Sequence, residues 1–107
     1  MIDAGLSLAE RISALIEAEL AEAEATDDPV LRQTAGDMRK MLRSPKEVTV
    51  SFSGGLTRKC WSVTHGDGDY RVIYMPLAGY FSLCVESGFG PLDIGVHGSA
   101  LGCFSSV

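Results

Sequence analysis

The spacing of hydrophobic positions changes near Pro45 and divides the chain into two halves. Before Pro45 the apolar residues recur every three or four positions, which is typical of one face of an α-helix. After Pro45 apolar and polar residues alternate, which is the period of a β-strand with one buried face. The pattern therefore predicts a helical hairpin over residues 1–44 and an antiparallel sheet over residues 47–107.

The first predicted helix starts at Ser7, which can form a capping box with Glu10. One face carries a continuous stripe made of Leu8, Ile12, Leu15, Ile16, Glu19 and Ala23, widened by Leu20. Glu17, Glu22 and Glu24 fall elsewhere on the helix. This glutamate-rich face suits either docking to a partner or simple exposure to solvent, because glutamate is a good helix former. Both interpretations stay open.

The second predicted helix starts at Asp28 as N-cap, with Pro29 in the first helical position. Its apolar stripe consists of Leu31, Ala35, Met38, Met41 and Leu42, and its last turns carry Arg39, Lys40 and Arg43. We expect the helix to close at Ser44, because a residue before proline avoids the helical conformation. The short connection between the two helices predicts a hairpin or a sharp bend.

Alternating segments predict four or five meander strands at 47–53, 57–65, 70–75, 80–87 and 92–97. In the last of these we expect Leu92, Ile94 and Val96 to face inward, and Asp93, Gly95 and His97 to face outward. The tail, residues 98–107, is apolar enough to dock, but its pattern does not say whether it forms a strand.

Helices followed by strands indicate an α+β fold in a single domain, residues 1–107. We expect a two-layer sandwich, with both N-terminal helices packed on one face of a 4–5-stranded antiparallel meander sheet. The other face is rich in Ser, Thr and Cys. In an antiparallel sheet such a face is normally in contact with water.

Charge narrows the choice of partners. The net charge is −5, so direct binding to nucleic acid is not expected, since phosphate contact needs clustered Lys and Arg. A basic surface on another protein suits this charge better. Three cysteines without a close pair indicate reduced thiols and a cytoplasmic location. No signal peptide is apparent, and no apolar run approaches the ~20 residues of a membrane span.

The stretch HGDGDY at residues 65–70 is the densest group of polar functional side chains. A calcium loop fails, because the position that should supply a bidentate Glu is Ala78. A phosphate loop fails, because a strand-like segment follows where a helix is needed. Asp-Gly between alternating runs predicts a hairpin instead, with Asp67 and Asp69 at an exposed acidic tip.

Metal and nucleophile chemistry receive little support. The two histidines and three cysteines lack the close ligand pairs of structural zinc sites, so no metal or cofactor is predicted. Cys84 and His97 both fall on outward faces, and paired strands would bring them together as a Cys–His site. No protease or hydrolase motif surrounds any cysteine, so this enzyme remains an alternative rather than the main hypothesis.

Two tyrosines complete the candidate contacts. Tyr70 and Tyr74 share one face of the third strand, where they form either an exposed interface or part of the core. The candidate partner-binding residues are thus Asp67, Asp69, Tyr70, Tyr74, Glu17, Glu22 and Glu24.

The sequence favours a small acidic protein-binding domain without catalytic activity, an inhibitor or adaptor that docks on a partner protein. Phage-encoded inhibitors of host defence, anti-CRISPR proteins among them, and toxin-immunity proteins share this size and charge, although no motif assigns the chain to a family. A self-assembling subunit is an alternative, for instance a homodimer, because an apolar last strand invites pairing. A Cys/His-dependent enzyme is a further alternative.

Overall fold

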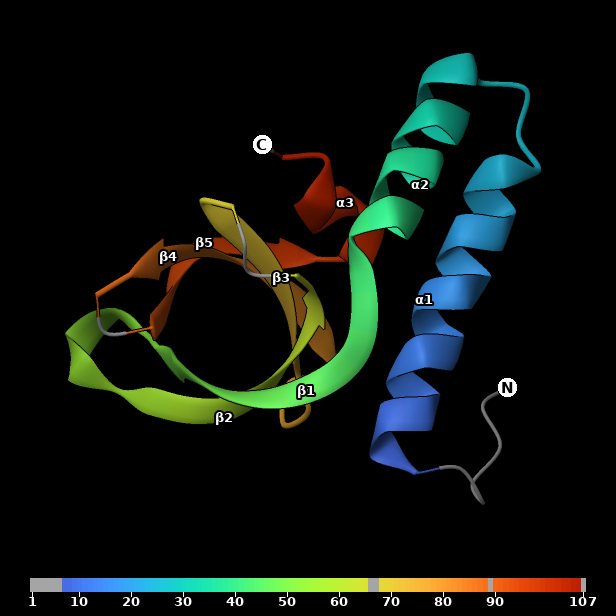
Figure 1. Ribbon diagram of the computed structural model, residues 1–107. Coiled ribbons are helices and arrows are strands. Elements are labelled where there is room, and N and C mark those ends of the chain that lie inside the picture. The colour runs from blue at the N-terminus through green and yellow to red at the C-terminus, as the bar shows by residue number, and fades with distance from the viewer. Residues whose placement is uncertain (1–6, 66–67, 89, 107) are drawn as a thin grey trace.

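The part of the chain that the structure describes folds as three α-helices packed against one side of a five-stranded, mostly antiparallel barrel (Figure 1). This computed structural model describes residues 7–65, 68–88 and 90–106. The helices are α1 (Leu8–Glu24), α2 (Pro29–Met41) and α3 (Ala100–Phe104), and the strands are β1 (Leu42–Ser51), β2 (Thr57–Thr64), β3 (Tyr70–Met75), β4 (Tyr80–Ser87) and β5 (Gly90–Gly98). The α+β prediction is confirmed, with the sheet closed rather than open.

Both predicted helix starts are present. Ser7 Oγ accepts a hydrogen bond from the Glu10 amide at 3.2 Å, and Glu10 Oε1 accepts one from the Ser7 amide at 3.0 Å. Asp28 Oδ1 accepts from the amide of Val30 at 2.9 Å and from that of Leu31 at 3.3 Å. These bonds satisfy amide groups that have no partner inside the helix, so each helix begins where its sequence indicates.

The second helix ends earlier than predicted. It stops at Met41, and Leu42–Ser51 form strand β1. Arg43 is therefore a strand residue, not part of the last helical turn. The pairing of β1 with β2 is irregular between Leu42 and Lys46, where Pro45 lies. A proline cannot donate to a ladder and disfavours a helix before it, so the chain leaves the helix ahead of Pro45 and starts the strand with a bulge.

Closure of the sheet reverses the expectation for its second face. Strand β1 pairs with β2 on one side and with β5 on the other, where Ser51 lies opposite Leu92. The face expected to meet water is instead the barrel interior. Ser62, Ser82 and Cys84 are 0% exposed, and Cys60 is 1% exposed. Small side chains fit there because the interior of a five-stranded barrel is narrow.

Strand β5 also differs from its predicted facing. Leu83 lies opposite Val96, whereas the next residue, Cys84, lies opposite Asp93, so Ile94 and Gly95 bulge out of the ladder. Gly95 takes a φ of 82°, which glycine adopts without steric cost. The bulge leaves Ile94 43% exposed and Leu92 37% exposed. The Asp93 side chain, expected outside, is only 10% exposed.

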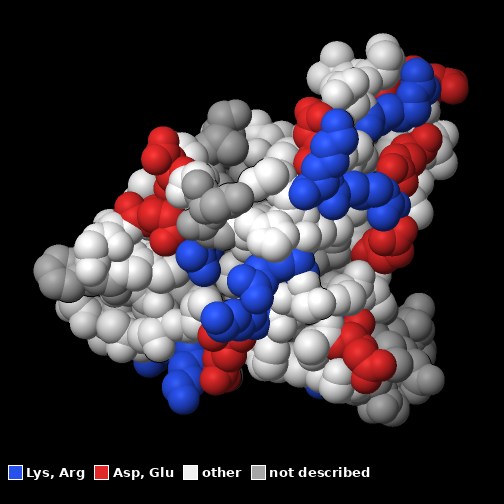
Figure 2. Space-filling model, viewed as in Figure 1, with Lys and Arg blue, Asp and Glu red and all other residues white. Residues whose placement is uncertain are grey.

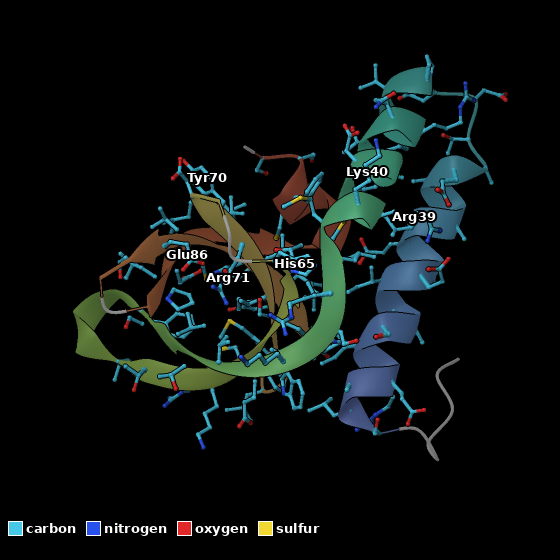
Figure 3. The ribbon with its side chains drawn as sticks, in the orientation of Figure 1. Arg39, Lys40, His65, Tyr70, Arg71 and Glu86 are labelled. Atoms are coloured by element: carbon cyan, nitrogen blue, oxygen red, sulfur yellow. The ribbon has the colours of Figure 1, made fainter. Side chains whose placement is uncertain are left out.

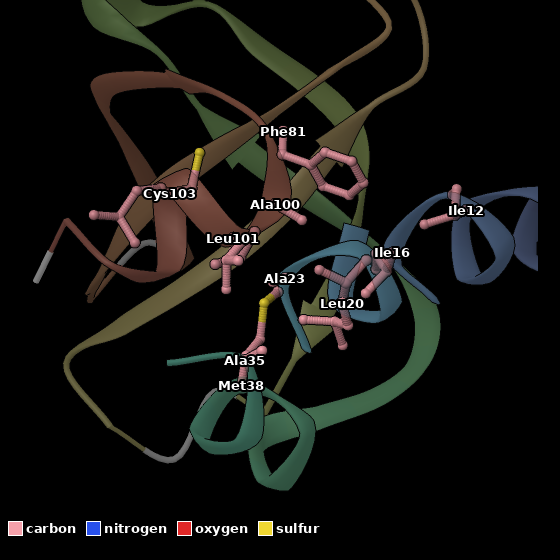
Figure 4. Packing of buried hydrophobic residues seen from close by; sticks show 13 residues of the cluster. Ile12, Ile16, Leu20, Ala23, Ala35, Met38, Phe81, Ala100, Leu101 and Cys103 are labelled. Atoms are coloured by element: carbon pink, nitrogen blue, oxygen red, sulfur yellow. The ribbon is translucent and has the colours of Figure 1, made fainter. Parts of the chain in front are cut away.

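Two apolar clusters result, one on each side of the sheet. The larger lies between the barrel and the helices, and it includes Ile12, Leu20, Met38, Phe81 and Leu101 (Figure 4). The smaller fills the barrel with Val50, Cys60, Ile73 and Cys84. The predicted inward residues of the first strand, Val48, Val50 and Phe52, therefore face the barrel interior and not the helices.

The tail forms the short helix α3, which Glu19 attaches to α1. Glu19 Oε2 accepts a hydrogen bond from the Ala100 amide at 3.1 Å, and Oε1 accepts one from the Leu101 amide at 3.0 Å. Glu19 lies in the apolar stripe of α1, where an unpaired carboxylate would be costly. The two amides explain its place there. Behind them, Ala100, Leu101 and Cys103 are buried in the larger cluster.

We predict that Glu19→Ala lowers the free energy of unfolding by about 1–3 kcal/mol, because two amides lose a charged acceptor. Urea unfolding measures this loss, and hydrogen exchange reports whether the Ala100 and Leu101 amides become less protected. Glu22→Ala is the matched control, since Glu22 lies on the same helix but is exposed. An equal loss in both variants, with unchanged amide protection, would contradict the role assigned to Glu19.

Candidate functional site

A polar network occupies part of the barrel interior. Arg71 Nε donates a hydrogen bond to Glu86, and Arg71 Nη1 lies 3.4 Å from Ser62 Oγ. Figure 3 shows Arg71 and Glu86 inside the ring of strands. The side chain of Arg71 is only 15% exposed, so its charge needs a partner nearby. Glu86 provides that partner, and the pair thereby fills the interior without an unpaired charge.

Asp93 is the centre of a second polar group. The Ser82 hydroxyl donates to Asp93, and His97 Nε2 lies 3.1 and 3.2 Å from the two Asp93 oxygens. The ring of Tyr80 stacks on His97 with centroids 4.7 Å apart. In a nucleophilic relay the imidazole stands between the hydroxyl and the carboxylate. Here the carboxylate stands between them, which is the arrangement of a structural network.

The proposed pairing of Cys84 with His97 is not the pairing that the strands make. The residue opposite Cys84 is Asp93, and the residue opposite His97 is Ser82. Burial raises the pKa of the Cys84 thiol to about 12, with a smaller contribution from the nearby Asp93 carboxylate. Burial likewise raises the pKa of Cys60 and of Cys103 to about 11. Thiols of this kind stay protonated at neutral pH and are poor nucleophiles.

Two of the three candidate glutamates join the helices to each other. Arg39 of α2 lies between α1 and α2 (Figure 3) and holds Glu17 with two hydrogen bonds of 2.8 and 2.9 Å. It holds Glu24 with two more, of 2.7 and 2.8 Å. Hydrogen bonding by the Arg39 guanidinium lowers the pKa of both carboxyl groups. Glu17 and Glu24 thus have an intramolecular partner.

Glu22 lies instead in an acidic groove, which we define as the hollow between α1, α2 and α3. The groove has a volume of about 510 Å³. Its carboxylates come from Glu19, Glu22 and Asp28, while Ala23, Val30, Leu31 and Leu101 supply apolar surface. Val30 is 72% exposed. Within the described residues no Lys or Arg lines this groove, so its charge is negative.

The two candidate tyrosines have different environments. Tyr74 packs against the larger apolar cluster, and its ring lies 5.0 Å from that of Phe81. Tyr70 is 43% exposed and borders a second hollow, which we call the β3 pocket. This pocket has a volume of about 290 Å³. It is lined by Met41, Thr64, Tyr70, Arg71, Val72, Leu83 and Phe104.

The structure describes only one of the two aspartates of the predicted acidic tip. Asp69 is exposed, and its carbonyl oxygen accepts a hydrogen bond from the Glu86 amide at 2.9 Å. Asp67 lies outside the described residues. The segment between Thr64 and Tyr70 does connect two antiparallel strands, as the hairpin prediction requires.

In residues 7–65, 68–88 and 90–106, no group of three or more His, Cys, Asp or Glu side chains is arranged to hold a metal ion. None of the helices in these same ranges is both long and apolar enough to cross a membrane.

Sequence reasoning missed both hollows. The groove needs α3, which the tail pattern did not predict, and the β3 pocket joins Met41 to Phe104 across 63 positions of sequence (104 − 41). The one available signal was Glu19, a carboxylate in an otherwise apolar stripe, which calls for a buried partner.

We predict that Arg39→Gln lowers the melting temperature at about pH 7 and has a smaller effect at about pH 3. The folded pKa values of Glu17 and Glu24 are depressed, so their stabilisation is present above the ordinary pKa near 4.5 and is lost as pH falls through the folded values. Lys40→Gln removes the same charge from an exposed neighbour and is the control. A pH-independent effect of Arg39→Gln would contradict the ion pairs.

We predict that all three thiols resist a disulfide reagent at about pH 8 in the native state and react fully in urea, because burial blocks access and raises each pKa. The measurement is the time course of thiol labelling, read by mass spectrometry. Rapid labelling of Cys84 alone in the native protein would instead identify it as a reactive thiol.

Comparison with known proteins adds no identity: no family model, no curated protein and no solved structure matches the chain.

Proposed function

We propose that this protein is a non-catalytic binding domain that docks on a partner protein and receives a positively charged segment of it in the acidic groove. The observation that carries the proposal is the combination, in one hollow, of carboxylates with exposed apolar surface. Such a combination suits a basic amphipathic segment, whose cations meet the carboxylates while its apolar side chains cover Val30 and Leu31.

Glu22 is the carboxylate best placed to meet a partner. The other two carboxylates of the groove already accept hydrogen bonds within the protein, because Glu19 binds the start of α3 and Asp28 caps α2. Glu22 is exposed at the groove. The remaining glutamates of the predicted docking face, Glu17 and Glu24, support binding indirectly, because their bonds to Arg39 fix the helix pair that forms the groove.

Two observations favour binding over catalysis. The cysteines are buried and their pKa values are raised, which withholds the thiolate that a Cys-dependent enzyme needs. The Ser82, Asp93 and His97 side chains are arranged with the carboxylate in the centre, so the Ser82 hydroxyl bonds to the carboxylate and not to the imidazole. The polar side chains of the barrel interior form hydrogen bonds with one another. We therefore assign the proposed function to the surface.

The alternative of self-assembly through a sheet edge has less support in the closed sheet. Its basis was an apolar last strand without a neighbour, whereas β5 lies between β4 and β1 in the closed order. The apolar tail is α3, which packs on the protein itself. Closure is one of the ways in which β proteins avoid edge-to-edge pairing.

We predict that Glu22→Lys combined with Val30→Ser weakens partner binding at least about tenfold, because it replaces a carboxylate with a cation and removes the apolar contact. The probe is a helical peptide of about 20 residues with one Lys-rich and one Leu-rich face, measured by fluorescence anisotropy. The same peptide with Glu in place of Lys tests the charge requirement. Glu47→Lys, an exposed site on the barrel strand β1, is the matched control.

The same variants extend the test to natural partners. Wild type and Glu47→Lys should recover the same basic protein in stoichiometric amount from host lysate, and the groove variant should not. The proposal fails if both peptides bind alike, if the groove variant binds as well as the control, or if wild type recovers no stoichiometric partner.

A further inference from the structure

Positive charge is concentrated in one part of the chain. Residues 38–65 contain six of the nine Lys and Arg residues but only one of the fourteen Asp and Glu residues, so their net charge is +5. The rest of the chain has three of these cations and thirteen carboxylates, a net charge of −10. The basic stretch forms the end of α2 and the strands β1 and β2. Segregated charge of this kind directs a partner of opposite charge to one side of a protein.

Three of these cations make up what we call the basic face: Lys40, Arg43 and Lys46. Lys40 lies in the last turn of α2, and the other two lie in the first half of β1. Figure 2 shows Lys and Arg side chains gathered over the end of α2 and over β1. Lys40 and Lys46 are exposed, and Arg43 is half-buried. The basic face is therefore accessible to a partner.

The basic face retains its charge, because the protein does not neutralise it. Arg43 Nε donates a hydrogen bond to the Ser44 carbonyl oxygen at 3.2 Å, an acceptor without a net charge. Among the described residues, neither Lys40 nor Lys46 forms an ion pair. Arg39, by contrast, binds two glutamates of α1. The three cations of the basic face thus remain free to meet carboxylates of another molecule.

Carboxylates border the basic face at both ends. Glu17 and Glu24 lie at one end, around the residue that precedes Lys40. At the other end, Glu47 directly follows Lys46. Because charges act over about 8 Å at physiological ionic strength, an anion that extends past either end meets repulsion. A long nucleic acid and an anionic membrane surface both extend further, so a short segment with a few carboxylates fits best.

The local backbone favours contact through side chains. The ladder between β1 and β2 is irregular between Leu42 and Lys46. Pro45 lies in this stretch and has no amide hydrogen to donate. Both features disfavour the addition of a foreign strand to β1. Recognition at the basic face therefore depends on its cations.

We propose that the basic face binds a short acidic segment of a partner protein, whose carboxylates contact Lys40, Arg43 and Lys46. This surface is separate from the acidic groove, since none of the three residues lines the groove. The two surfaces select opposite charges. Binding at the basic face does not depend on the function proposed above.

The test compares two variants of equal net charge. Lys40→Glu combined with Lys46→Glu reverses two charges of the basic face. Arg11→Glu combined with Arg32→Glu reverses two exposed charges elsewhere on the helices and is the matched control. The probe is a fluorescent peptide of about 8 residues, Glu alternating with Ser, which spans about 25 Å when extended. Fluorescence anisotropy measures its affinity for the full-length protein, and circular dichroism checks that both variants fold.

We expect the basic-face variant to bind the acidic peptide at least about tenfold more weakly than wild type, because two charge-assisted contacts become repulsive. The control should lose at most about twofold, since only the long-range field changes and salt screens it. Equal losses in the two variants, or no binding to wild type, would overturn the proposal. Tighter binding of a single-stranded oligonucleotide or of anionic lipid vesicles, abolished in the basic-face variant, would assign the surface to that other class of partner and likewise overturn it.

Discussion

Strand β1 is paired with β2 along one side and with β5 at Ser51 and Leu92 on the other, and this closure turns the second face of the sheet into a barrel interior. An open sheet would leave Ser62, Ser82 and Cys84 in contact with water. In the closed sheet they are buried beside Val50 and Ile73 in the barrel interior. The helices are left with the outer face, where the larger apolar cluster forms.

Closure also determines what the charged residues inside can do. A buried carboxylate or guanidinium is tolerated only with a partner, and the interior supplies one for each charge, Glu86 for Arg71 and the Ser82 hydroxyl and His97 for Asp93. In the described part of the chain every buried polar side-chain atom has a hydrogen-bond partner. The Arg71–Glu86 and Ser82–Asp93 bonds thus join neighbouring strands of the barrel to each other.

Much of this architecture could be predicted from local sequence. Ser7, Glu10 and Asp28 define the helix starts through contacts within three positions. The alternating segments predicted four or five strands, and five are present. Closure could not be predicted, since Ser, Thr and Cys suit both a wetted face and a narrow interior. The bulge at Gly95 could not be predicted either, because it depends on the register between β5 and β4. This bulge inverts the expected facing of Asp93 and Leu92.

The candidate sites were less predictable than the fold, because they depend on α3. This helix has five residues and no periodic signal, and it is positioned by Glu19, which is 81 residues away from Ala100 in the sequence. Once placed, it borders the acidic groove on one side and the β3 pocket on the other. Isolated helices of this length do not persist in water, so α3 owes its position to tertiary contacts. A change that displaces α3 would therefore alter both hollows together.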